Sequence, residues 1–147
     1  MPRPPSRCGG GWLLVPYITA KGRCPVRVFL EELKRQALAK YVQFQEVLRA
    51  ELETRGPFEV GPPYWEGLGA GFYDIRWSGR CRIYCSLEGE QQIVMYIGCV
   101  KRWRTFESDD RHTCEGYRAD FQSEQYDQEQ REYLYRAREK GTADGPS

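Results

Sequence analysis

The first clear hydrophobic pattern of the chain starts at Pro25 and has the period of a helix. Apolar side chains then recur at the spacing of one helix face: Val26, Phe29, Leu30 and Leu33. Proline suits the first helical position because the amide hydrogen that it lacks would have no partner there. We therefore predict a helix from Pro25 to a short break near residues 35–36.

A second helix is predicted over residues 37–55, ending at Gly56-Pro57. Glycine favours the left-handed conformation after the last helical turn, and proline cannot continue a helix. The predicted inner stripe of this helix comprises Leu38, Tyr41, Val42, Gln45, Leu48 and Leu52. The two helices together are expected to form an αα-hairpin.

Residues 71–106 carry the pattern of three consecutive strands. A three-residue loop at Ser78-Gly79-Arg80 pairs Arg76 with Arg82 and separates apolar from polar side chains. A two-residue loop would mix them on both faces, since a shift of one residue exchanges the faces of a strand. The predicted core face carries Tyr73, Ile75, Trp77, Cys81, Ile83 and Cys85. The opposite face carries Asp74, Arg76, Arg82 and Tyr84, and the two opposed arginines there need a compensating partner.

The third strand, residues 93–100, is apolar on both sides, as in a strand at the centre of a sheet. One predicted side carries Ile93, Met95, Ile97 and Cys99, and the other carries Val94, Tyr96 and Val100. Residues 12–19 predict an edge strand, because Pro16 removes one ladder donor. We expect a loop over 57–71 in which Tyr64 and Trp65 pack as plugs, a polar loop over 107–113 and one helix over 114–140.

The length of 147 residues suits one domain with a tail at each end. We expect a disordered tail over 1–11, a folded domain over 12–121, and a polar helical extension with a disordered end over 122–147. The net charge is +1, but residues 1–106 are basic and residues 107–147 are acidic. This division favours either an anionic substrate with a self-shielding tail or simply a solvated acidic helix.

The six cysteines do not have the spacing of a metal site. The chain also has no apolar run long enough for a signal peptide or a membrane span. We therefore expect a cytoplasmic protein whose reduced thiols pack as small core residues, with no metal and no other cofactor.

Basic side chains concentrate on and beside the polar face of the predicted strand hairpin. Arginine binds phosphate oxygens through paired hydrogen bonds, and its charge stabilises a pentavalent transition state. RNA supplies its own nucleophile, the 2′-hydroxyl group, so its cleavage needs a base, an acid and charge stabilisation but no metal. The candidate catalytic residues are Arg76, Arg82, Lys101 and Tyr84. The candidate RNA-binding residues are Arg102, Arg104, Trp103 and His112.

A structural role for the same residues is the alternative hypothesis. Strand arginines commonly pair with nearby acids, and Asp74 is placed to reach Arg82 diagonally across the hairpin. Residues 101–104 could be a solvated strand end, and His112 an ordinary surface residue.

Several short segments, in order, resemble the RelE/ParE superfamily of toxins, and most closely its HigB-like, phage-derived branch. The segments are CPVRVFLEEL, RGPF, GFYDIR, GRCRIYC and IVMYIGCVKRWRTF. The resemblance implies an α+β fold in which an N-terminal αα-hairpin packs on a small twisted antiparallel sheet, with a C-terminal helix. It also implies that Arg76 and Arg82 hold and polarise the scissile phosphate, while Lys101 or Arg102 neutralises developing charge.

By this resemblance the protein is predicted to be the toxin of a type II toxin–antitoxin system. Its predicted activity is that of an mRNA interferase, a ribosome-dependent endoribonuclease that inhibits translation. The expected partners are a cognate helix-turn-helix antitoxin, mRNA and the ribosome, with no membrane and no small-molecule cofactor. Two alternatives stay open: a non-nucleolytic ParE-like inhibitor of a host enzyme such as gyrase, and a non-toxic phage-derived binding protein of the same fold.

Overall fold

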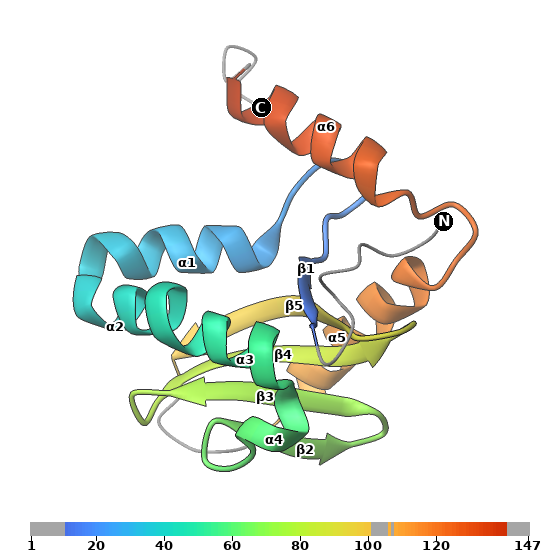
Figure 1. The fold of residues 1–147 in the computed structure, drawn as a ribbon. Helices are drawn as coiled ribbons and strands as arrows, with labels where there is room; N and C mark the ends of the chain where they lie inside the picture. The colour runs from blue at the N-terminus through green and yellow to red at the C-terminus, as the bar shows by residue number, and fades with distance from the viewer. Residues whose placement is uncertain (1–10, 101–105, 107, 141–147) are drawn as a thin grey trace.

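A five-stranded mixed sheet forms the centre of the molecule (Figure 1). The structure is a computed structural model that describes residues 11–100, 106 and 108–140. In chain order the strands are β1 (Leu13–Pro16), β2 (Trp65–Gly69), β3 (Phe72–Trp77), β4 (Cys81–Glu88) and β5 (Gln92–Val100), and their order in the sheet is β1-β5-β4-β3-β2. β1 pairs in parallel with β5, while the other neighbours are antiparallel. The α+β class is therefore confirmed, but the sheet is larger than predicted and is not wholly antiparallel.

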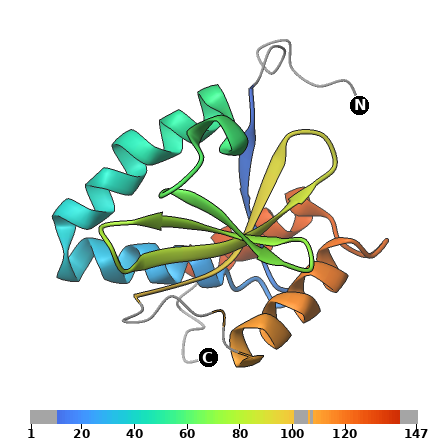
Figure 2. The same ribbon diagram turned by 90° about the horizontal axis from the view of Figure 1, so that it is seen from below.

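Helices cover both faces of this sheet. They are α1 (Pro25–Gln36), α2 (Leu38–Val42), the π-helix η2 (Gln43–Leu48), α3 (Arg49–Arg55), α4 (Pro57–Val60), α5 (Ser108–Phe121) and α6 (Gln128–Lys140). α2, η2 and α3 follow one another without a break and form a single rod, which ends at Gly56. α1 and this rod lie on one face of the sheet and α5 lies on the other (Figures 1 and 2).

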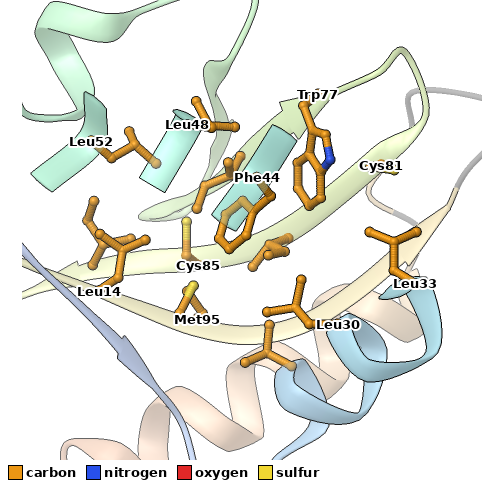
Figure 3. Packing of buried hydrophobic residues seen from close by; sticks show 14 of the residues in the cluster. Leu14, Leu30, Leu33, Phe44, Leu48, Leu52, Trp77, Cys81, Cys85 and Met95 are labelled. Atoms are coloured by element: carbon orange, nitrogen blue, oxygen red, sulfur yellow. The ribbon is translucent and has the colours of Figure 1, made fainter. Parts of the chain in front are cut away.

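The larger core lies between the sheet and the face of α1 and the rod (Figure 3). Trp77 lies in this core at the end of β3, and its ring stacks on Phe44 at a centroid distance of 4.9 Å. The indole nitrogen of Trp77 donates a hydrogen bond to the backbone oxygen of Lys40 at 2.8 Å, so its only polar atom is satisfied. The cysteines Cys24, Cys81, Cys85, Cys99 and Cys114 are free thiols, and all but Cys99 are fully buried. Their predicted role as small core residues is confirmed for the four buried cysteines.

The π-helix changes which residues of the rod face the core. A π turn is wider than an α turn, so residues four to five apart align along it. Phe44, Leu48 and Leu52 are buried at a spacing of four, whereas Leu38 and Val42 are exposed. The predicted inner stripe was therefore wrong at Leu38 and Val42, and it missed Phe44.

The β3–β4 hairpin has the predicted register. Arg76 pairs with Arg82, Asp74 with Tyr84, and Ile75 with Ile83. The three-residue turn requires positive φ angles at Ser78 (55°) and Gly79 (78°), and glycine adopts such angles without strain.

A β-bulge alters the faces of β5. Tyr84 pairs with Ile97 and Cys85 with Met95, so Tyr96 is the extra residue. Ile97 and Cys99 consequently pack on the α5 side together with Val94 and Tyr96, which corrects the predicted faces. The residue that points toward α1 is instead Gly98, and an added Cβ atom there would lie 2.3 Å from the Phe29 ring.

Two connecting segments differ from their predictions. Residues 57–71 are not a continuous loop, because they contain α4 and the edge strand β2. Trp65 is buried in β2 as a packed side chain, while Tyr64 is exposed. β1 is the opposite edge strand, as Pro16 predicted.

The predicted helix over 114–140 is two helices, and the predicted loop over 107–113 is corrected because α5 begins at Ser108. α5 stops where the Ser123 hydroxyl and amide groups both donate to the Asp120 carbonyl oxygen. α6 begins where a carboxylate oxygen of Asp127 accepts the amide hydrogen of Gln130 at 3.3 Å, as an N-cap does. The expected tail over 1–11 lies, except for Gly11, outside the described residues.

Candidate functional site

The polar face of the β3–β4 hairpin is a buried ion network with Asp74 at its centre. The Arg76 Nε atom donates to both Asp74 carboxylate oxygens, at 2.9 and 3.0 Å. The Arg82 Nη1 atom reaches Asp74 Oδ2 at 3.2 Å, the diagonal pair that the alternative hypothesis expected. On the neighbouring strand, Glu66 pairs with Arg76 Nη1 at 2.8 Å. Two carboxylates thus balance the two arginines that oppose each other across the hairpin.

This network is buried, which differs from the expected RNA-facing surface. Asp74 and Arg82 are 1% and 2% exposed, and only Arg76 and Glu66 lie near solvent. Two donors of the network, Arg82 Nε and Arg76 Nη1, form no well-aligned hydrogen bond with the described residues, and Arg76 Nη1 is held by the charge of Glu66 instead. Burial of a charge is tolerated when an opposite charge lies in contact, so the observed pairing explains how both arginines remain inside the protein.

α5 and Phe106 cover the face of the sheet that carries this network. The Phe106 ring lies 4.7 Å from the Tyr84 ring and 5.6 Å from the Phe72 ring. Two arginines of α5 hold the helix on β2 and on the β2–β3 turn: Arg111 donates to the Leu68 carbonyl oxygen in β2, and Arg118 donates to the Ala70 carbonyl oxygen in the turn. The cover is therefore attached by both apolar packing and hydrogen bonds.

Tyr84, one of the candidate catalytic residues, lies under this cover and is 1% exposed. The pKa of the Tyr84 hydroxyl is raised above its ordinary value. Burial is the largest cause, and the adjacent Cys99 is the next. A phenol with a raised pKa and no access to solvent cannot accept a proton from a bound 2′-hydroxyl group in this conformation.

Of the remaining predicted residues, His112 is the one that lies among the described residues, and no ion pair links it to this network. His112 is exposed on α5 and not in a loop as predicted. Lys101, Arg102, Trp103 and Arg104 lie outside the described residues. The structure therefore joins Arg76, Arg82 and Tyr84 on one face, together with Asp74 and Glu66, which the list of candidate residues omitted.

Arg76 is the arginine of the network that lies nearest to solvent. This side chain lines a pocket of about 300 Å³ at the turn end of the hairpin, with Gln43, Pro63, Tyr64, Trp77, Ser78 and Gly79. A larger cavity of about 570 Å³ lies between the β1–α1 connection and α6, and its lining contains none of the predicted catalytic or RNA-binding residues.

Within residues 11–100, 106 and 108–140, no three His, Cys, Asp or Glu side chains are grouped as a metal site requires. No helix in the same part of the chain is long and apolar enough to cross a membrane. No family model matches the chain, and no curated protein is significantly similar to it.

Proposed function

We propose that this protein is a toxin of the RelE/ParE type that acts by binding a host protein and does not cleave RNA. In this proposal α1 and the α2–η2–α3 rod correspond to the N-terminal αα-hairpin of that superfamily. The protein would act in the cytoplasm and would be neutralised by a helix-turn-helix antitoxin.

The burial of Arg82 and Tyr84 is the observation that favours binding over cleavage. A nuclease needs its phosphate-binding and proton-transferring groups within hydrogen-bond reach of the substrate. Here the Arg82 guanidinium group is bound to Asp74, and Phe106 packs on the Tyr84 ring. The toxin part of the proposal rests on the order of the resembling segments, which occupy α1, β3, β4 and β5 of one α+β domain.

The second candidate is the ribosome-dependent mRNA endoribonuclease. It is favoured by the pocket beside Arg76, because a phosphate group there would lie against a partly accessible guanidinium group, with the Tyr64 ring nearby. In this candidate mechanism Phe106 and α5 must move away from the sheet before Arg82 and Tyr84 can meet RNA.

Induction of the gene in a bacterial host, with sequencing of transcript 5′ ends, separates these functions. The proposal predicts that growth stops while no new transcript ends arise. New ends at defined codons would establish the nuclease, and undisturbed growth would refute the toxin proposal altogether.

Two variants refine the same experiment. Arg76→Lys keeps the charge but loses the bidentate contact, and Arg80→Ala removes an exposed arginine of the adjacent turn as a matched control. The proposal predicts that both folded variants still arrest growth. Loss of arrest in Arg76→Lys alone, with an unchanged circular dichroism spectrum, would support the nuclease.

A further inference from the structure

Three large aliphatic side chains form an exposed line on the outer side of the rod. Leu38, Val42 and Val47, here called the α2 ridge, are 58%, 41% and 56% exposed. Val42 follows Leu38 by four residues, one α turn, and Val47 follows Val42 by five, one π turn. The change of helix type therefore places all three on the same side. In Figure 2 the rod runs along the outer edge of the molecule.

The α2 ridge is not needed by the core of the protein. The core side of the rod is already occupied by Phe44, Leu48 and Leu52, which are buried. Single exposed aliphatic residues are common, but three on the same side of one helical rod are of the kind used for protein contacts. The ridge spans roughly 13 Å along the rod, which is about two and a half turns of a second helix.

The charge beside the ridge is negative and unpaired. Glu46 is exposed and lies between Val42 and Val47 in the chain, and no described side chain forms an ion pair with it. The next acid along the rod, Glu51, already pairs with Arg55 at 2.9 Å. A partner that covers the ridge must therefore supply a cation opposite Glu46.

This charge decides among the possible occupants. A second copy packed about a two-fold axis through the ridge would bring Glu46 close to Glu46, and like charges disfavour that contact. An anionic lipid surface would be repelled by the same carboxylate. An amphipathic helix with an apolar stripe and a basic residue satisfies both the shape and the charge.

We propose that the α2 ridge docks an amphipathic helix of a partner protein, with a Lys or Arg of that helix facing Glu46. The inference goes beyond the proposed function, since it names a surface and the chemistry of its partner, and it holds whether or not the protein arrests growth.

The test uses the purified full chain and a pair of fluorescein-labelled model peptides of about five helical turns. One carries leucines on one helical face and lysines on the other, and the matched peptide has glutamates in place of the lysines. Fluorescence anisotropy at physiological ionic strength gives the two dissociation constants. The lysine peptide is expected to bind at least about tenfold more tightly than the glutamate peptide.

Matched variants show whether the ridge is responsible. Glu46→Lys is expected to reverse the peptide preference, whereas Glu115→Lys, the same charge change on the exposed side of α5, is expected to retain it. Val42→Asp is expected to weaken binding of the lysine peptide about tenfold, and Val28→Asp, at an exposed valine of α1, is expected to leave it unchanged.

Three results would overturn the inference. The first is a failure of the peptide test: either the lysine peptide does not bind, or Glu46→Lys and Glu115→Lys change its binding equally. Equal effects would indicate non-specific electrostatic attraction. The second is a dimer in sedimentation velocity that Val42→Asp dissociates. The third is binding to phosphatidylserine vesicles that Val42→Asp abolishes.

Discussion

Replacement of Asp74 by asparagine tests the buried network in the most direct way. The Asp74 carboxylate accepts both contacts from Arg76 Nε and the contact from Arg82 Nη1. Asparagine would accept through one oxygen and would turn an amide donor toward the guanidinium groups. Because loss of one partner leaves buried charge uncompensated, we expect Asp74→Asn to lower the free energy of unfolding by about 3–5 kcal/mol.

The loss would be large against the whole stability of the domain, since single domains typically unfold at a cost of about 5–15 kcal/mol. Urea titration followed by tryptophan fluorescence measures it, because Trp65 and Trp77 are buried. With a urea dependence of about 1–3 kcal/mol per molar, the midpoint should fall by more than about 1 M. Glu115→Gln, an exposed acid on α5, is the control and should not shift the midpoint.

A third variant separates pairing from packing. Asp74→Leu combined with Arg76→Met and Arg82→Met removes all charge from the network's centre, and such exchanges are often neutral or stabilising by about 1–4 kcal/mol. We expect the triple variant to be more stable than Asp74→Asn. If Asp74→Asn instead unfolds at the same urea concentration as Glu115→Gln, the network does not stabilise the fold and our reasoning is refuted.

Three further predictions concern other parts of the fold. Gly98→Ala places a Cβ atom against the Phe29 ring, so it should lower the free energy of unfolding by about 1–3 kcal/mol, measured by urea titration. The double variant Gly98→Ala/Phe29→Ala should recover part of this loss. A Gly98→Ala variant as stable as the original protein would contradict this packing. The hydrogen bond from Arg131 lowers the pKa of Asp120, so this ion pair stabilises the fold fully above the unfolded pKa of about 4, and its contribution is lost as pH falls through the lower, folded pKa. Hydrogen exchange should show that α6 loses protection in this acidic range. Asp120→Asn should remove the pH dependence of that protection. Burial raises the pKa of Cys114 to about 12, so iodoacetamide at pH 8 should leave it unmodified until the protein unfolds.

The sequence predicted the structure correctly where one of two possible arrangements conflicted with the side-chain pattern. The register of β3 and β4 was predictable because a shift of one residue would have mixed charged and apolar side chains on both faces. The start of α1 was predictable because Pro25 fits the first turn and no later one.

Local rules failed where the backbone leaves its regular period. The π-helix inserts a wider turn between residues 43 and 48, so a strict period of 3.6 placed Leu38 and Val42 inside and left Phe44 out. The bulge at Tyr96 exchanged the faces of Ile97 and Cys99 in the same way. The parallel pairing of β1 with β5 joins residues far apart in the chain, and no local pattern encodes it.

The candidate site shows the same division. That Asp74, Arg76, Arg82 and Tyr84 share a face followed from strand alternation. The burial of Tyr84 did not, because its cover comes from Phe106 and α5, which are distant in sequence and have little apolar periodicity. The alternation of Asp74 with Arg76 on one strand was the available signal for an internal ion pair.

Arg82 is buried and bound to Asp74, and we propose that it is therefore not available to RNA. Arginine-selective labelling with phenylglyoxal, read by mass spectrometry, compares Arg82 with Arg80, which is exposed in the adjoining turn. We predict that Arg82 reacts on the order of a hundredfold more slowly than Arg80, as expected for a group exposed only by local opening that costs about 3 kcal/mol. Labelling of Arg82 at the rate of Arg80, with protection by an added RNA oligonucleotide, would contradict the claim and place RNA on this face.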